Sequence, residues 1–186
     1  MHELYHSGKW WDNDLTADAN GLPAFRAANR FFDGSNEHVF YESSSLGHLN
    51  DHVHELYYNG KWWDNDLTAD TDGPPAYWVS LTGFSEQGIH RLFYVSNSDY
   101  HVRELYYNGN WWGNDLTADT HGPSGQSTQL TSLVFGGSNE HVFYMSDGDY
   151  HVRELYYNGN WWGNDLTVDT NGPAAIPAAV TSFATP

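Results

Sequence analysis

The chain has 186 residues, of which 39% are hydrophobic and 17% aromatic, and it contains no cysteine. This composition suffices for a packed core, and it excludes a disulfide framework and a thiolate metal site. The formal charge of −17 repels phosphate backbones and anionic membrane surfaces, which argues against nucleic acid as a partner.

The N-terminal segment lacks the basic start and the apolar stretch of a secretory signal. No apolar run approaches the length of about 18 residues that a membrane-spanning helix needs. We therefore expect a soluble protein without membrane insertion, either cytoplasmic or released by a non-classical route.

A motif that begins Glu-Leu-Tyr starts at residue 3 and returns at residues 55, 104 and 154. Each copy continues through a glycine, a pair of tryptophans and the sequence Asn-Asp-Leu-Thr. In the last three copies an Asn-Gly pair, at 59–60, 108–109 and 158–159, separates two strand-like runs. Because a tight hairpin needs residues that accept positive φ, we expect these pairs to join two antiparallel strands.

Two further blocks recur between the copies of this motif. One covers 37–41, 90–94 and 140–144, and a weaker one covers 79–82 and 131–134, with a last version at 180–183. All are short, rich in Val, Tyr, Phe, Trp and Thr, and separated by turn-forming residues. Each period of about fifty residues therefore predicts a four-stranded antiparallel meander, and no segment sustains a helical apolar period over ten residues.

Four-stranded units of this length are typical of β-propeller blades. We predict an all-β fold, a β-propeller of four-stranded antiparallel blades with about four blades per chain. One domain would cover residues 1–186, with an incomplete blade at 1–24, blades at about 25–73, 74–122 and 123–172, and a closing strand at about 173–186. That strand would close a ring of four, or two chains would share a ring of seven or eight. Because open strand edges invite pairing, we expect a homo-oligomer.

The tryptophan pair supplies the first candidate functional residues. Successive residues of a strand face opposite sides, so if Trp63 joins Leu67 in the core, Trp62 faces outward or into a gap between blades. An indole offers an apolar face to the C–H side of a pyranose ring. The first tryptophan of each copy is thus a candidate sugar contact, with packing between blades as the alternative: Trp10, Trp62, Trp111 and Trp161.

A carboxylate in strand three and a charged or imidazole group in strand two form the second set. Neighbouring antiparallel strands would place them side by side, where they present donors and an acceptor to the hydroxyls of one sugar. The alternative is a structural ion pair. The carboxylates are Glu3, Glu55, Glu104 and Glu154, and the strand-two groups are His38, Arg91 and His141.

The remaining polar motifs favour structural roles. The Asn-Asp-Leu-Thr segment is expected to satisfy turn backbone groups. The acidic stretch 64–66 lacks the ligand spacing of a calcium loop, and no catalytic motif is present, so we expect neither a metal, nor a cofactor, nor an enzyme. Candidate groups that occur in matched copies favour several equivalent binding sites.

The pattern His-Val-x-Glu-Leu-Tyr-Tyr-x-Gly-x-Trp-Trp-x-Asn-Asp-Leu-Thr, at 52–68, 101–117 and 151–167, resembles the repeats of the Photorhabdus-type propeller lectins. More distantly it is similar to other fungal and bacterial fucose-binding propellers. The resemblance implies a non-enzymatic lectin that needs no metal and holds fucose or related sugars between adjacent blades. In the distant fucose-binding propellers, an arginine of strand two and a glutamate of strand three hold the sugar. Arg91 and Glu104 match that pair, whereas His38 and His141 stand at the arginine position.

We therefore expect a multivalent lectin whose partners are fucosylated or related glycans. Two rival functions come from other classes. One is a propeller scaffold for protein partners, which would bind through divergent loops at 25–33 or 124–129. The other is an enzyme of the sialidase type.

Overall fold

The computed structural model describes residues 1–33, 36–43, 51–126, 130–135 and 139–175. It contains three four-stranded antiparallel sheets and one two-stranded hairpin. The hairpin consists of β1 (His2–His6) and β2 (Trp10–Asp14). The first sheet contains β3 (Ala24–Asp33), β4 (Asn36–Ser43), β5 (Val53–Tyr58) and β6 (Trp62–Asp66). The second contains β7 (Ala76–Glu86), β8 (Ile89–Ser96), β9 (Val102–Tyr107) and β10 (Trp111–Asp115). The third contains β11 (Thr131–Phe135), β12 (Asn139–Met145), β13 (Val152–Tyr157) and β14 (Trp161–Asp165).

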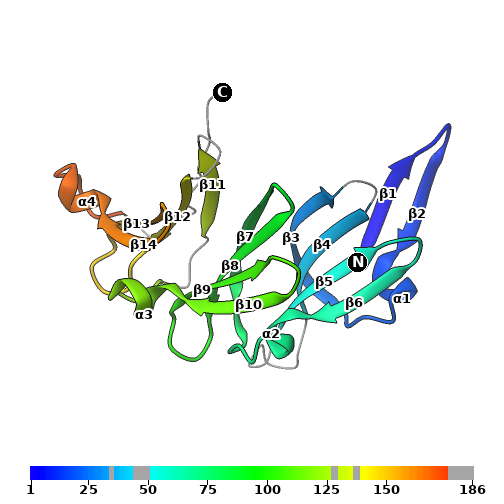
Figure 1. Cartoon of the computed structure of the whole chain (residues 1–186), viewed down its shortest axis with the longest axis horizontal. Coiled ribbons are helices and arrows are strands. Elements are labelled where there is room, and N and C mark those ends of the chain that lie inside the picture. The colour runs from blue at the N-terminus through cyan, green and yellow to red at the C-terminus, as the bar shows by residue number, and fades with distance from the viewer. Residues whose placement is uncertain (34–35, 44–50, 127–129, 136–138, 176–186) are drawn as a thin grey trace.

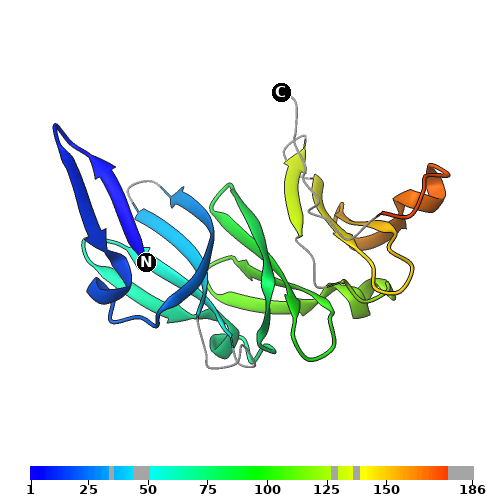
Figure 2. The ribbon, with the colours of Figure 1, turned by 180° about the vertical axis from the view of Figure 1, so that it is seen from behind.

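The sheets follow one another in chain order along an open arc, with the hairpin at one end and the third sheet at the other (Figures 1 and 2). Their first strands, β3, β7 and β11, contact one another in sequence along the arc. In each sheet, neighbouring strands are also neighbours in the sequence, as in a propeller blade. The predicted all-β propeller architecture of four-stranded antiparallel blades is confirmed. The described residues do not close a ring of four.

Each seam between two sheets is filled by alternate residues of the facing strands. In the seam between the first and second sheets, Phe40, Val53 and Leu67 pack against Leu92, Tyr94 and Leu105. In the seam between the second and third sheets, Val102 belongs to the corresponding cluster. Because Val102 and Leu105 of β9 lie in different seams, the predicted opposite facing of alternate residues is confirmed. The core of the molecule therefore lies between the sheets.

The Asn-Gly pairs form the expected hairpins between the third and fourth strands of each sheet. Gly60, Gly109 and Gly159 have φ angles between +104° and +107°, which side-chain-bearing residues rarely adopt. Glycine is therefore required at the tip, and it fixes the register that places each glutamate of strand three opposite an asparagine of strand four.

The Asn-Asp-Leu-Thr segments end in one-turn helices that the sequence did not predict: α1 (Leu15–Asp18), α2 (Leu67–Asp70), α3 (Leu116–Thr120) and α4 (Leu166–Asp169). In α2, the Asp66 carboxylate accepts a hydrogen bond from Ala69 N at 2.9 Å. The Thr68 hydroxyl accepts one from Val53 N at 2.8 Å. The motif does satisfy backbone groups, as expected. It builds a helical turn of only four or five residues, too short to show a periodic pattern.

Two predicted loops differ in the structure. Residues 25–33 were expected to form a divergent loop, but they lie in β3. Of residues 124–129, Gly125 forms an isolated bridge with Ser146, and 127–129 lie outside the described residues. Most of the expected closing strand, residues 176–186, also lies outside them. No helix in the described part of the chain is long and apolar enough to cross a membrane.

Candidate functional site

A cleft of about 340 Å³ opens in the seam between the first and second sheets. Ligand-binding pockets generally measure about 300–1,000 Å³, so this cleft has the size of a site for a small ligand. The first sheet contributes polar groups and the second mainly aromatic ones. The lining residues are Asn36, His38, Glu55, Tyr57, Asn65, Asp70, His90, Tyr107 and Trp111.

A hydrogen-bonded row of polar groups forms one wall of this cleft. Glu55 Oε1 lies 2.7 Å from His38 Nδ1, and Glu55 Oε2 accepts a hydrogen bond from Asn65 Nδ2 at 2.8 Å. Both carboxylate oxygens are thus fixed in direction. His38 Nε2 is buried and has no hydrogen-bond partner among the described residues. A buried polar atom costs free energy unless it is paired, so this nitrogen is an unsatisfied polar group in a residue that lines the cleft.

Aromatic rings form the opposite wall. Trp111 stands edge-on to Phe40, with ring centroids 6.0 Å apart, and its ring also lies 5.4 Å from that of Tyr107. The ring of His90 lies 4.6 Å from that of His38 across the seam. Trp111 is only half-buried, so it packs between the sheets and also lines the cleft. The packing alternative thus holds for this tryptophan, and its contact with a sugar stays a prediction.

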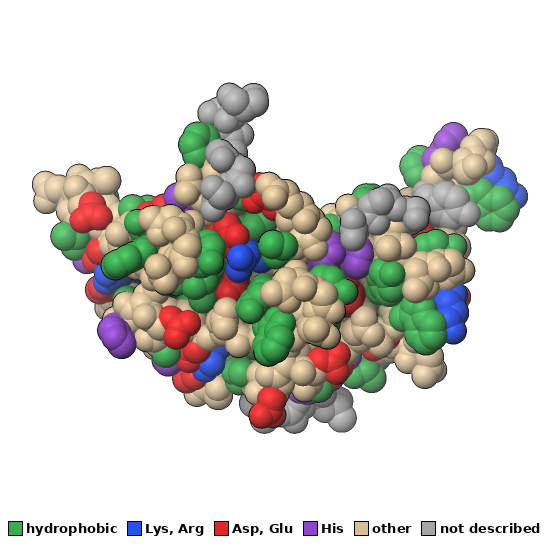
Figure 3. Space-filling model, viewed as in Figure 1, with side chains coloured by type: hydrophobic (Ala, Val, Ile, Leu, Met, Phe, Trp, Pro, Cys, Tyr) green, Lys and Arg blue, Asp and Glu red, His purple; other side chains and the backbone are tan. Residues whose placement is uncertain are grey.

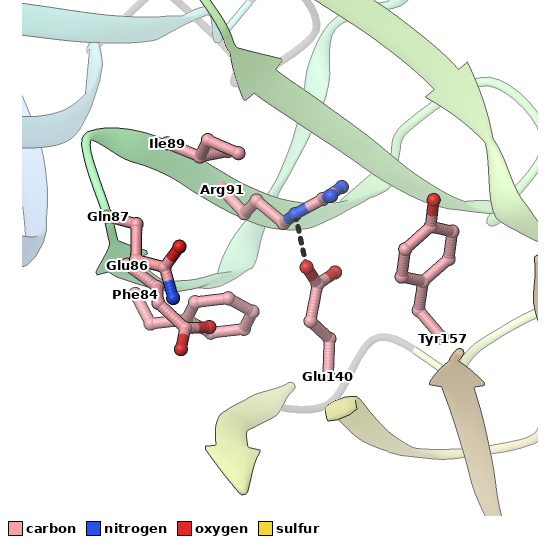
Figure 4. A pocket seen from close by; sticks show the side chains of 7 residues that line it. All are labelled: Phe84, Glu86, Gln87, Ile89, Arg91, Glu140 and Tyr157. Carbon is pink, nitrogen blue, oxygen red and sulfur yellow. Dashed lines mark ion pairs between the residues drawn. The ribbon is translucent and has the colours of Figure 1, made fainter. Parts of the chain in front are cut away.

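The seam between the second and third sheets holds a second cleft of about 300 Å³, with different chemistry (Figure 4). Its lining residues are Phe84, Glu86, Gln87, Ile89, Arg91, Glu140 and Tyr157. Arg91 bonds to Glu104 within its own sheet, and its Nε lies 2.8 Å from Glu140 Oε1 across the seam. The guanidinium also lies 5.5 Å and 5.2 Å from the ring centroids of Tyr106 and Tyr157.

Glu140 is the perturbed acid of this second cleft. Burial raises its pKa to about 7, although the nearby positive charge of Arg91 acts in the opposite direction. The charge of the cleft therefore changes near neutral pH. Two residues predicted to bind sugar in this seam do not line the cleft. Glu104 is fully buried, and the ring of Trp161 packs against that of Phe93 with centroids 5.9 Å apart.

The glutamate sites at the two ends of the arc, at Glu154 and Glu3, are less enclosed than those in the two seams between four-stranded sheets. His141 Nδ1 lies 2.8 Å from Glu154 Oε1 on the third sheet, which is the last sheet of the described part of the chain. At the other end, Glu3 lies 3.1 Å from Arg30 Nη2 and 3.3 Å from Asn13 Nδ2. Trp62 is half-buried beside the cluster of Leu15, Val39, Tyr41 and Leu56, whereas Trp10 is 72% exposed. The structure thus brings together each predicted strand-two and strand-three pair, and at Trp111 it also places a predicted tryptophan in the wall of the same cleft.

The expected placement of the second tryptophan is wrong. Trp63, Trp112 and Trp162 are about half exposed, and none of them joins the core. Each indole nitrogen donates to the side-chain oxygen of an asparagine four residues earlier, at 3.1–3.2 Å. Trp112 is 51% exposed even though the third sheet follows it.

Several lining residues were missed by the sequence interpretation. Asn65 stands directly opposite Glu55 in the strand register, so its contact was predictable from the hairpin alone. Tyr57 lies two positions after Glu55, on the same face of β5. His90, Tyr107 and Glu140 reach the clefts from across a seam, and no local sequence signal identifies such contacts.

Two groups of three candidate metal ligands occur among the described residues: Asp99, His101 and Asp115, and Asp149, His151 and Asp165. In the first group, Arg103 Nη1 lies 2.9 Å from Asp115 Oδ2, and its Nη2 lies 2.5 Å from Asp99 Oδ2. A permanent cation thus already forms an ion pair with each of these two carboxylates. In the first sheet, Asp64 and Asp66 are bonded to His54 and His52, at 3.1 Å and 2.7 Å. These clusters act as clamps between strands.

Comparison with known proteins shows similarity in structure only. No protein-family model matches the chain, and no curated protein matches it. A fucose lectin from Kordia zhangzhouensis, solved in complex with methyl-fucoside, is similar with a TM-score of 0.52 and 21% identity, covering 75% of this chain and 97% of that one. The Aleuria aurantia lectin, a six-bladed β-propeller with a novel fucose recognition mode, is similar with a TM-score of 0.55 and 18% identity. That match covers 97% of this chain, which spans 58% of the Aleuria protein. The chain therefore has the β-propeller fold found in these lectins.

Proposed function

We propose that the protein is a multivalent lectin that binds fucose or related glycans in the seams between its sheets, as a relative of the Photorhabdus-type propeller lectins. Both solved structures to which it is similar are described as fucose-binding lectins. The proposal extends their ligand class to this chain on the basis of its own cleft chemistry. The strongly acidic surface, on which carboxylates are scattered among apolar side chains, suits a neutral ligand better than an anionic one (Figure 3).

The observation that carries the proposal is the wall formed by His38 and Glu55 opposite Trp111. Glu55 offers a fixed carboxylate acceptor, and His38 Nε2 is buried and unpaired among the described residues. Neighbouring hydroxyls of a pyranose can bond to both groups while its C–H face lies against the indole. The cleft thus combines the directional polar contacts and the apolar platform that a neutral sugar requires.

The cleft at Arg91 would bind by a variation of this chemistry. Its guanidinium is fixed by two carboxylates and flanked by two tyrosine rings, so it can donate to a hydroxyl without reorganising. Glu140 Oε2 is buried and has no hydrogen-bond partner among the residues described. We infer that the two seams differ in affinity and in pH dependence.

Titration calorimetry with methyl-fucoside, supported by a glycan array, tests the proposal. Glu55→Gln removes the charged acceptor at the cleft of the first seam, and hydrogen bonds to charged groups contribute about 1.5–3 kcal/mol. We expect the affinity of this cleft to fall by about tenfold or more. Trp112→Ala is the control. It removes the indole next in sequence to Trp111, and this indole lines none of the described clefts.

Other outcomes separate the rival functions. Silence across the array, with unperturbed folding, would contradict the lectin and favour the protein-binding scaffold. Equal loss of binding in Glu55→Gln and Trp112→Ala would also contradict the proposed cleft. Turnover of a chromogenic glycoside would instead identify an enzyme.

A further inference from the structure

One face of the third sheet, defined here by Phe143, Val152 and Leu166 and called the open face, lacks the cover that its counterparts have. The equivalent residues are Phe40, Val53 and Leu67 in the first sheet, and Phe93, Val102 and Leu116 in the second. All six of these are fully buried against the following sheet. Phe143, Val152 and Leu166 are only half-buried. The same apolar pattern is thus covered twice and left uncovered once.

The two seams between four-stranded sheets show what covers such a face. The covering sheet presents a leucine of its third strand and the first tryptophan of its fourth strand. In the first seam these are Leu105 and Trp111, and the indole stands edge-on to Phe40. In the second seam they are Leu155 and Trp161, and the indole stands edge-on to Phe93. The geometry therefore repeats, with ring centroids 6.0 Å and 5.9 Å apart.

The N-terminal hairpin presents the same pair of residues to solvent. Leu4 and Trp10 occupy the corresponding positions of β1 and β2, lie on one face of the hairpin, and are 69% and 72% exposed. Within one chain this hairpin lies at the opposite end of the arc from the open face, so it cannot cover that face itself (Figures 1 and 2). Exposed apolar groups of this kind mark an interaction surface.

We propose that the open face of the third sheet binds the N-terminal hairpin of a second copy of this chain. Trp10 of the second copy would stand edge-on to Phe143, as Trp111 stands to Phe40. The same contact would bring an indole beside the His141–Glu154 pair, which has no tryptophan of a following sheet in its own chain. On the proposed lectin function, this contact completes a further sugar site from two chains.

The adjoining residues also fit. In the seam between the hairpin and the first sheet, a carbon at the Cβ position of Gly21 would lie 3.0 Å from the Asp64 carboxyl, so glycine leaves room for this aspartate. Asp12 of the hairpin corresponds to Asp64, and Gly172 after α4 corresponds to Gly21. The open face therefore has a glycine where Asp12 of the second copy would lie.

The contact joins two different surfaces of the chain. Further copies can therefore add without limit unless the rotation from one copy to the next closes a ring. Two copies carry six four-stranded sheets and two hairpins, twice the three sheets and one hairpin of one chain. Six complete blades and two half-blades fall within the size range of about four to eight blades for known propellers. A closed dimer is therefore the assembly that we expect.

Size-exclusion chromatography with light scattering tests this inference on the full chain at about 150 mM salt, where repulsion between the acidic copies is screened. The native chain should have twice the chain mass of 21.1 kDa. Leu4→Glu adds a charge to the contact but only to an exposed position of the single chain, so it should give a folded species of one chain mass. Val168→Glu is the control, because Val168 is exposed and its counterparts Ala69 and Ala118 stay exposed where a sheet follows.

Sugar titrations on the same samples keep this inference separate from the lectin proposal. A dimer that Leu4→Glu dissociates, with no sugar bound by either form, would support the docking contact and contradict the lectin. A native chain that stays monomeric at all concentrations, or a dimer that Leu4→Glu leaves intact, would overturn the docking contact. Sugar binding by such a chain would leave the lectin proposal standing.

Discussion

Glu140 lies in the seam between the second and third sheets, and its charge state links the packing of this seam to pH. Its pKa is about 7 in the folded chain and near the ordinary value of 4.5 when the chain is unfolded. The folded state therefore binds the Glu140 proton more tightly, and the free energy of unfolding falls as pH rises from about 4.5 to about 7. Above that window the folded protein carries the full cost of a buried anion.

Glu140→Gln removes this dependence while keeping the shape of the side chain. We expect the variant and the native chain to be similarly stable near pH 5, and the variant to be the more stable one at pH 8. Urea unfolding at several pH values measures the difference, and Asp119→Asn, an exposed change on α3, serves as control. A difference between Glu140→Gln and the native chain that stays constant from pH 5 to pH 8 would contradict the assignment.

The contacts within one sheet were predictable at the residue scale. Repeated glutamates and their strand-two partners lie on adjacent strands, where the pairing of strand two with strand three makes His38 and Glu55, and likewise Arg91 and Glu104, diagonal neighbours that bond. The exposure of Trp63 was not predictable, because alternation tells which face a residue occupies and not how far the next sheet extends. Contacts across a seam, such as that of Arg91 with Glu140, depend on the packing of whole sheets.

At the scale of single elements, the one-turn helix α3 fastens two strands together. The buried Thr117 hydroxyl accepts a hydrogen bond from Val102 N at 2.9 Å. Thr117→Val keeps the shape but leaves this buried N–H without a partner, which costs about 1–3 kcal/mol of unfolding free energy. Thr117→Ser should retain most of the stability because it retains the acceptor. Denaturant unfolding compares the two variants, and equal stability would show that the bond contributes little.

The sequence predicted the strands in which side chains alternate regularly between the two faces, and it missed the strand in which this alternation is interrupted. The second to fourth strands of each sheet alternate over five to eight residues and end at turn residues. In β3, register shifts between Ala24 and Arg26 and between Ala27 and Asn29 break the period of two. The sequence of this strand therefore has the pattern of a loop. The one-turn helices escaped prediction because four or five residues carry no helical period.

At the scale of the whole molecule, the main contacts of each described sheet are with the sheets next to it in the chain, as in other repeat architectures. The repeat predicted this local order, but it did not predict whether the ends meet. The arc leaves Leu4 and Trp10 at one end and Phe143 at the other, so the proposed assembly of chains would determine how many of the proposed sugar sites are complete. Several weak sites on one particle would bind a glycan-bearing surface far more tightly than one site.

A crystal structure of the protein soaked with methyl-fucoside tests the central claim most directly. The account predicts a sugar in the cleft between the first and second sheets, with one hydroxyl within hydrogen-bond distance of Glu55, another near His38 Nε2, and a C–H face on Trp111. A sugar bound only elsewhere, or an empty cleft at a ligand concentration that saturates binding in solution, would contradict it.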